Sequence, residues 1–245
     1  MPLPTLAGTT VVPSAYLFDL DGVLTPTADL HRAAWQNLFD AALPRLAPEA
    51  APYVDADYFR YVDGRSRLEG IATLLASRGV VLPVGEPTDA PGTATLSAMG
   101  NSKDAEFRAA LAAQGMAPYP GSLRFLDALA GHPVTQAVVT SSANAALVLE
   151  ASGLAPRFEF VVDGVRARRE GLAGKPDPAT YLRGAELLEV APASAVVVED
   201  AVSGVAAGRA GGFGLVIGVN RGAGADDLTA AGAHLVVDDL SELLP

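Results

Sequence analysis

The chain has 245 residues and a mass of 25.0 kDa, half of its residues are hydrophobic, and its formal net charge is -11. This length suits one large domain or two unequal ones, and the composition predicts a folded core rather than a disordered chain. The negative charge argues against a general nucleic-acid or anionic-membrane surface, because both need clustered Lys and Arg. The absence of cysteine excludes disulfides, thiolate metal sites and a cysteine nucleophile.

The first fifteen residues do not resemble a signal peptide, because they contain no Lys or Arg and no continuous apolar run. No stretch of the sequence approaches the roughly 20 apolar residues that a membrane span needs. We therefore expect a cytoplasmic protein that binds neither membrane nor nucleic acid.

The first predicted element is a short buried strand within residues 11–18, including Val11 and Val12, and it leads into two carboxylates. Asp19 and Asp21 lie one residue apart, and Gly22 then turns the chain. Two acids in such a place repel each other and lose hydration, a cost normally offset by a divalent cation bound through oxygen ligands. A plain turn is the alternative, because Asp and Gly are common turn residues.

The next ninety residues or so show helical patterns and no convincing strand. Thr27 can cap a helix that runs through Ala41, and we expect Pro44 to end it. A Pro- and Gly-rich link follows at residues 83–92. The further helical patterns cover residues 55–62, 68–77 and 95–114.

After the turn signal Tyr119-Pro120-Gly121, apolar strands and helices alternate. Strands are predicted at residues 134–139, 158–162, 195–198, 213–219 and 234–237. Helices are predicted at residues 122–130, 144–152, 179–188, 202–210 and 225–231. The cluster of Arg166, Arg168 and Arg169 reads as a solvated loop.

This alternation predicts an α/β fold with a doubly wound parallel, Rossmann-like sheet. The first strand belongs to the same sheet, so the helical segment must be an insertion after the Asp19/Asp21 loop. We expect a core domain formed by residues 1–28 and 119–245, and a small α-helical cap domain at residues 29–118.

The polar residues that follow the predicted strands should meet in one cleft, because ligands of open α/β sheets bind beyond the carboxyl ends of the strands. Thr140-Ser141-Ser142 offers hydroxyls and backbone N–H groups that could hold an anion. A helix cap formed by Ser142 or Asn144 is the alternative. Lys175, restrained by Pro176, would add a cation, although a lone loop lysine is commonly just solvated.

Glu199 and Asp200 end another wholly apolar strand and so repeat the feature seen at Asp19 and Asp21. Two acids at a helix N-terminus can also be explained by the helix dipole alone. Taken together, however, the four acids suggest an oxygen-rich Mg²⁺ site.

Four motifs in this order resemble those of the haloacid dehalogenase superfamily, and the resemblance covers essentially the whole chain. They are Asp19-Leu20-Asp21-Gly22-Val23, Thr140-Ser141, Lys175-Pro176 and Glu199-Asp200. The resemblance implies phosphoryl transfer through an aspartyl-phosphate, with Asp19 as nucleophile and Asp21 as general acid and base. It also implies that Thr140 and the Ser141 N–H hold phosphoryl oxygens while Lys175 neutralises charge. The implied Mg²⁺ ligands are Asp19, the backbone carbonyl of Asp21 and Asp200, with Glu199 close by.

Within the superfamily the chain is most similar to the β-phosphoglucomutase group of sugar-phosphate enzymes. Thr27, His31 and Trp35 match the group's first cap helix, Gly64, Ser66 and Arg67 match its phosphate-contacting cap loop, and Lys103 matches its cap lysine. The implied substrate-binding residues are Thr27, His31, Arg67, Lys103, Ser141 and Asn144. Departures from the group's pattern are Pro26, Arg65, Glu69-Gly70 and the link at residues 83–92.

The group implies a Mg²⁺-dependent phosphotransferase acting on a small phosphorylated sugar, most like the conversion of β-glucose 1-phosphate to glucose 6-phosphate. A sugar-phosphate phosphatase with the same nucleophile is the alternative. A non-catalytic binding domain is a minor alternative, because such a domain is expected to lose Asp19 or Asp21, and this chain has both. We expect a monomer or a weak homodimer.

Overall fold

The computed structural model describes residues 13–244 and divides into two compact units. The first unit contains the residues up to Pro26 together with those from Met116 onward, and the second is Thr27–Gly115. The second unit covers nearly the same residues as the insertion expected at residues 29–118. That this unit acts as a cap domain remains a proposal. Val11 and Val12 of the predicted first strand lie outside the described residues.

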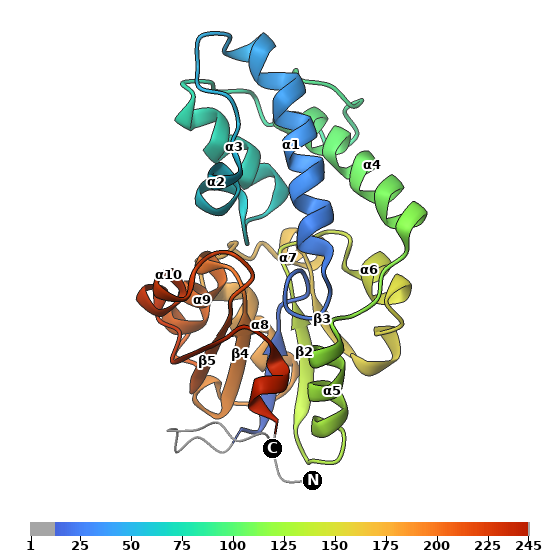
Figure 1. Cartoon of the computed structure of the whole chain (residues 1–245), viewed down its shortest axis with the longest axis vertical. Coiled ribbons are helices and arrows are strands. Elements are labelled where there is room, and N and C mark those ends of the chain that lie inside the picture. The colour runs from blue at the N-terminus through green and yellow to red at the C-terminus, as the bar shows by residue number, and fades with distance from the viewer. Residues whose placement is uncertain (1–12, 245) are drawn as a thin grey trace. The chain divides into compact units, whose positions relative to one another are not determined.

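The first unit is built on a six-stranded, wholly parallel sheet with the order β3-β2-β1-β4-β5-β6 (Figure 1). This confirms the doubly wound sheet predicted from the sequence. The strand order reverses beside β1, and ligands of such sheets bind at the carboxyl ends of the strands next to that point. The strands are β1 (Ala15–Phe18), β2 (Thr135–Val139), β3 (Phe160–Val162), β4 (Ala195–Glu199), β5 (Leu215–Val219) and β6 (Leu235–Val237).

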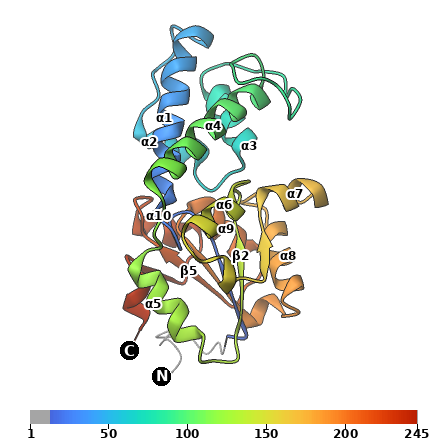
Figure 2. The same ribbon diagram turned by 90° about the vertical axis from the view of Figure 1, so that its right-hand side faces the viewer.

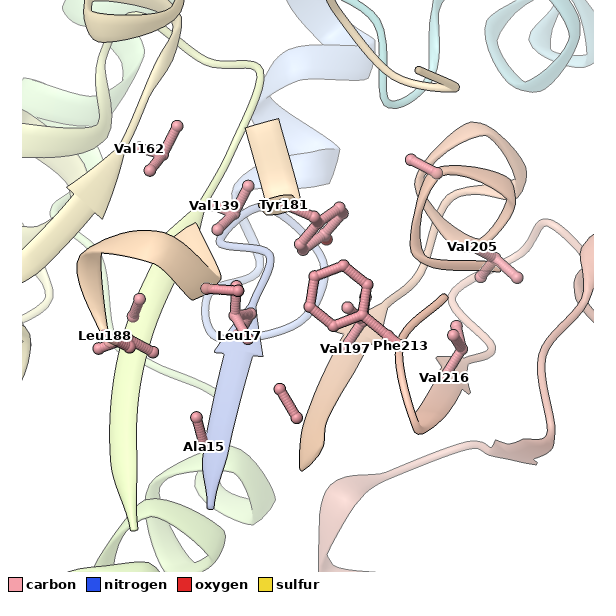
Figure 3. Packing of buried hydrophobic residues seen from close by; sticks show 14 of the residues in the cluster. Ala15, Leu17, Val139, Val162, Tyr181, Leu188, Val197, Val205, Phe213 and Val216 are labelled. Atoms are coloured by element: carbon pink, nitrogen blue, oxygen red, sulfur yellow. The ribbon is translucent and has the colours of Figure 1, made fainter. Parts of the chain in front are cut away.

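Strand β1 is buried on both faces, because helices pack on each side of the sheet. Successive side chains of a strand point to opposite faces. Leu17 lies in a cluster with Tyr181 and Phe213 (Figure 3), whereas the rings of Tyr16 and Phe18 lie 5.7 and 6.2 Å from that of Phe125. Helices α5 (Pro120–Leu129) and α8 (Ala179–Leu187) therefore cover opposite faces, as Figure 2 also shows.

The remaining helices of the first unit include one that the sequence did not predict. Helix α7 (Gly164–Glu170) contains the three arginines expected in a loop, so that prediction was wrong. Asp163 accepts a hydrogen bond from the Arg166 N–H at 2.7 Å, and Gly171 ends the helix with a φ of 67°. Its turns lack the apolar periodicity from which helices are predicted. The others are α6 (Ala145–Ala151), α9 (Val202–Ala210), α10 (Ala225–Ala231) and the 3₁₀ turns Ala155–Arg157, Pro192–Ser194 and Leu240–Leu243.

The second unit is helical, and its described residues contain no strand. Helix α1 runs to Leu46, so Pro44 does not end it as expected. Proline removes one backbone donor, but here it does so only in the final turn, where Ala42 and Leu43 are buried and Ala47 N still donates to Leu43 O. The elements are α1 (Thr27–Leu46), α2 (Asp55–Asp57), a π-helical turn (Tyr58–Val62), α3 (Arg67–Ser77) and α4 (Leu96–Gln114).

None of the helices among the described residues combines the length and the apolar character that a membrane span requires.

Candidate functional site

The site begins where β1 ends, at Asp19. The Asp19 N–H donates to Val198 O at 2.9 Å, which continues the pairing of β1 with β4 by one residue. The Asp19 side chain is buried, with 6% of the residue exposed. The sheet itself therefore fixes this carboxylate beside the end of β4, whose last residue is Glu199 and which Asp200 follows.

Lys175 lies at the centre of the buried site. Its Nζ donates to Asp19 Oδ1 at 2.6 Å, to Glu199 Oε1 at 2.5 Å and to Val139 O at 3.2 Å. Three acceptors use all three hydrogens of a lysine ammonium. Burial acts to lower the pKa of Lys175, but the charges of Asp19 and Glu199 outweigh it and raise that pKa. Lys175 is therefore a fixed positive charge at neutral pH.

Glu199 is fully buried and accepts four hydrogen bonds. Besides Lys175, Oε1 accepts from the Tyr181 hydroxyl at 3.1 Å, while Oε2 accepts from the N–H groups of Asp200 and Ala201 at 2.9 Å each. A Cβ placed on Gly204 would lie 1.7 Å from Oε1. The carboxylate thus occupies the space that a side chain at position 204 would need.

A group of three acids could hold a metal ion. One carboxylate oxygen from each of Asp19, Glu199 and Asp200 lies within 4.8 Å of the other two. Such hard oxygen donors suit a divalent cation. The set does not include the side chain of Asp21, whose expected contribution is its backbone carbonyl. The lack of a side chain at Gly22 leaves room for the Asp200 carboxylate. A Cβ at Gly22, which has a φ of 88°, would lie 1.8 Å from Asp200 Oδ2.

The charge balance of the site fits a bound cation. Burial raises the pKa of Asp19 well above its usual range, and the charges of Glu199 and Asp21 add to this effect, whereas Lys175 opposes it. One lysine thus faces several buried carboxylates. A divalent cation at the three-acid group would favour the ionised form of Asp19.

Asp21 and Thr140 come together from β1 and β2. Thr140 Oγ1 lies 3.5 Å from Asp21 Oδ2 and accepts from the Ser142 N–H at 3.1 Å. Of the two residues that could cap α6, Asn144 makes no side-chain cap hydrogen bond. The loop is bonded within itself instead, since Ser142 Oγ accepts from the Asn144 N–H at 3.2 Å.

In the second unit, His31 and Lys103 are in contact. Lys103 is buried, its Nζ bonds to His31 Nδ1, and it lies 4.9 Å from the ring centroids of both Trp35 and Phe107. The rings of His31 and Phe107 stack at 4.1 Å. The two aromatic faces stabilise the ammonium group and hold it in place.

Arg67 begins α3 and is paired within the second unit. Its Nη1 lies 2.7 Å from Asp104 Oδ1 and donates to Gly100 O at 3.1 Å. Glu69, a departure from the β-phosphoglucomutase pattern, forms a capping box with Ser66 at the start of this helix. Thr27 is the buried first residue of α1.

The family model for haloacid dehalogenase-like hydrolases matches residues 13–212. The chain belongs to this family. It is 46% identical over 238 residues to a β-phosphoglucomutase from Mycobacterium bovis, covering 94% of this chain and 91% of the relative. It is also 31% identical to hexitol phosphatase A from Escherichia coli, over 93% of this chain and 92% of the relative.

A solved structure shows the same fold. The crystal structure of β-phosphoglucomutase from Clostridium difficile superposes with a TM-score of 0.75 at 24% identity, covering 95% of this chain and 93% of that one. The suspected haloacid dehalogenase-like family and the fold are confirmed, and the chain is an enzyme of this family.

Three residues that contact the predicted site residues could not be identified from the sequence. Tyr181 reads as an ordinary core residue of a helix, and nothing local shows that its hydroxyl reaches Glu199. Gly204 lies five residues after Glu199, and a glycine inside a helix is a general sign of close packing that does not identify what packs there. Asp104 follows Lys103 directly, yet its pairing with Arg67 joins residues of two helices.

Proposed function

We propose that this enzyme is a Mg²⁺-dependent phosphotransferase of small sugar phosphates that converts β-glucose 1-phosphate to glucose 6-phosphate. The observation that carries the proposal is the buried contact of Lys175 with Asp19 and Glu199, two members of the three-acid group. The 46% identity to a β-phosphoglucomutase supports the choice of substrate. We also retain a cytoplasmic location and a monomer or weak homodimer as parts of this proposal.

In the proposed reaction Asp19 is the nucleophile. A bond forms between its carboxylate oxygen and phosphorus while the bond from phosphorus to the leaving sugar oxygen breaks, which gives an aspartyl-phosphate. Lys175 lowers the repulsion between the two anions and keeps Asp19 in place. Asp19, Asp200 and the carbonyl of Asp21 would hold Mg²⁺, which would add positive charge at the phosphoryl group. Glu199 uses both oxygens in hydrogen bonds, so we assign it to orienting Lys175.

Asp21 is the proposed general acid and base. It delivers a proton to the leaving oxygen and later removes one from the hydroxyl that accepts the phosphoryl group. Thr140, 3.5 Å from Asp21, and the Ser141 N–H bind phosphoryl oxygens, with Asn144 nearby in the same loop. In the second unit we assign Arg67 and Lys103 to the sugar's second phosphate and His31 and Thr27 to substrate binding.

The two aspartates should respond differently to substitution. We expect Asp19→Asn to abolish turnover because an amide cannot form the aspartyl-phosphate. Asp21→Asn should cripple turnover but leave Mg²⁺ binding largely intact, since its side chain is outside the three-acid group. Steady-state rates and calorimetric Mg²⁺ titration measure the two effects. A residual activity of tens of percent in either variant would contradict these roles.

A sugar-phosphate phosphatase is the second candidate. It is favoured by the 31% identity to a hexitol phosphatase and by the pairing of Arg67 with Asp104, which reduces the charge available for a second phosphate. In this case water replaces the sugar hydroxyl as acceptor.

One assay separates the two candidates. The enzyme is incubated with β-glucose 1-phosphate and a trace of the 1,6-bisphosphate, with Mg²⁺ and with EDTA, and Asp19→Asn is the control. Glucose 6-phosphate formed only with Mg²⁺ supports the mutase. Free glucose with inorganic phosphate supports the phosphatase, and no product from either route refutes both.

A further inference from the structure

Arg221 lies just beyond the end of β5 and makes contacts that the proposed chemistry does not use. Its Nε donates to Gly22 O at 3.0 Å and its Nη1 donates to Asp238 O at 2.8 Å. The guanidinium carbon lies 3.9 Å from the ring centroid of Tyr119. The side chain is largely buried, with 20% exposed.

Two of the residues that Arg221 touches, Gly22 and Tyr119, lie in the two segments that connect the first unit to Thr27–Gly115. Gly22 follows Asp21 in the segment that leads from the first unit to the second. Tyr119 lies in the segment that returns to the first unit, directly before α5. The segments are bonded to each other, since Tyr119 N donates to Leu24 O at 3.0 Å and Ser122 Oγ donates to Val23 O at 2.6 Å. One guanidinium therefore holds both segments close to the Asp21 peptide.

The loop that Arg221 contacts is compact. Gly22 N donates to Thr25 O at 2.8 Å, and the N–H groups of Leu24 and Thr25 both donate to Leu20 O at 3.0 Å. Asp200 packs against Gly22 so closely that a Cβ could not be added there. The Gly22 peptide is thus held between Asp200 and Arg221, and its orientation sets that of the preceding Asp21.

Arginine suits this position better than lysine. Its planar guanidinium can stack on an aromatic ring while donors on its edge reach two separate carbonyls. A lysine would keep the charge but could not stack on Tyr119 and reach both Gly22 and Asp238.

We propose that Arg221 is a positioning residue for Asp21, which acts by fixing the Gly22 carbonyl and joining it to the returning segment at Tyr119. This inference rests on the proposed function, because it assumes that Asp21 moves protons. The competing explanation is that Arg221 only holds the C-terminal segment in place, through its hydrogen bond to Asp238 O and its ion pair with Asp239 at 3.7 Å, and the experiment decides between the two.

The experiment compares Arg221→Met and Arg221→Lys with Arg157→Met, whose arginine pairs with Asp127 at 2.6 Å on the surface of the same unit. Hydrogen exchange by mass spectrometry follows residues 20–25 and 235–244, and steady-state assays with β-glucose 1-phosphate give kcat and KM. We expect Arg221→Met to speed exchange in residues 20–25 and to lower kcat by roughly tenfold, the effect of one lost hydrogen bond to a charged donor. KM should stay within about twofold, because substrate contacts are unchanged.

The conservative variant Arg221→Lys distinguishes loss of positioning from a general folding defect. Arg221→Lys should recover part of kcat, whereas Arg157→Met should change neither exchange in residues 20–25 nor kcat. Unchanged exchange in residues 20–25 and unchanged kcat in Arg221→Met would overturn the proposal, as would faster exchange confined to residues 235–244. If the wild-type enzyme transfers no phosphoryl group, the proposed function fails, and the exchange data still show whether Arg221 fixes the loop.

Discussion

Two buried tyrosines, one on each face of β1, differ in whether their hydroxyl groups form a hydrogen bond. Tyr181 donates to Glu199, whereas the buried Tyr16 hydroxyl has no partner among the described residues. Burial raises the pKa of both, that of Tyr16 to about 12, so both remain protonated donors near neutral pH. Only the Tyr181 hydroxyl supports the carboxylate that orients Lys175.

We therefore expect Tyr181→Phe to destabilise the protein by about 1 kcal/mol and to lower kcat several-fold, because Glu199 loses one of four donors. The ring remains, so the packing of Lys175 against it at 4.9 Å is kept. Tyr16→Phe is the matched control and should be neutral or slightly stabilising, since it removes a buried hydroxyl without a partner. Thermal unfolding and steady-state rates measure both variants. Equal effects of the two substitutions would exclude a special role for the Tyr181 hydroxyl.

The raised pKa of Asp19 predicts how metal binding depends on pH. In the metal-free protein the folded state holds the Asp19 proton more tightly than the unfolded chain, in which the pKa of this carboxyl is 3.8. Stability is therefore lost as the pH rises above that value and through the folded pKa. Lys175 does not titrate in this range, because its pKa is raised.

Mg²⁺ should reverse this loss, since it favours the ionised carboxylate. We expect the rise in Tm on adding saturating Mg²⁺ to be larger at about pH 8 than at about pH 5. Calorimetry at several pH values measures it, and Asp19→Asn should flatten the dependence. A rise in Tm that is independent of pH would argue against Asp19 as a ligand.

At the scale of elements, the strands were the most predictable part of the chain. Their apolar runs are short and bounded by turn residues, so the parallel sheet and the four groups of polar residues at its edge could be placed from the sequence. Helix α7 could not, because two of its three arginines, Arg166 and Arg169, pair with Glu170, which is itself bonded to Arg183 of α8 at 2.9 Å. The contacts of Tyr181 with Glu199 and of Arg221 with Gly22 join residues 18 and 199 positions apart, which no local pattern reveals.

Replacing Gly204 of helix α9 by alanine tests whether helix propensity or the geometry of the site has the larger effect on stability. Alanine inside a helix is normally more stable than glycine by roughly 1 kcal/mol. Gly204→Ala should instead destabilise the protein by about 1–3 kcal/mol and lower kcat, because the new methyl group displaces the Glu199 carboxylate.

Gly131→Ala is the control for this test. Among the described residues, no atom outside Gly131 and its two chain neighbours lies within 4 Å of the position that a Cβ at Gly131 would take, so the substitution should be close to neutral. Urea unfolding gives the stability change and steady-state assays give kcat. A stabilised and fully active Gly204→Ala would show that Glu199 does not need its observed position.

On the scale of the whole molecule, the few lysines are used in an unusual way. The chain has two, Lys103 and Lys175, and both are buried, although lysines mostly lie on protein surfaces. The net charge of -11 gives no general attraction for an anionic sugar phosphate. A sugar phosphate, the proposed substrate, would therefore have to be bound by local cations. We propose that the cations of the second unit decide whether a sugar hydroxyl or water accepts the phosphoryl group.

Arg67 is the cation on which that choice can be tested. If it binds the second phosphate of a sugar bisphosphate, Arg67→Ala should shift the products from glucose 6-phosphate toward glucose and phosphate by tenfold or more, roughly the loss of one charge-assisted contact. The aspartyl-phosphate should still form, because Asp19 and Lys175 are unchanged. Arg108→Ala is the matched control, since Arg108 pairs with the same Asp104 at 2.8 Å but is half exposed. A similar product ratio in both variants would mean that Arg67 serves only to pack α3 against α4 through Asp104, and that another group holds the second phosphate.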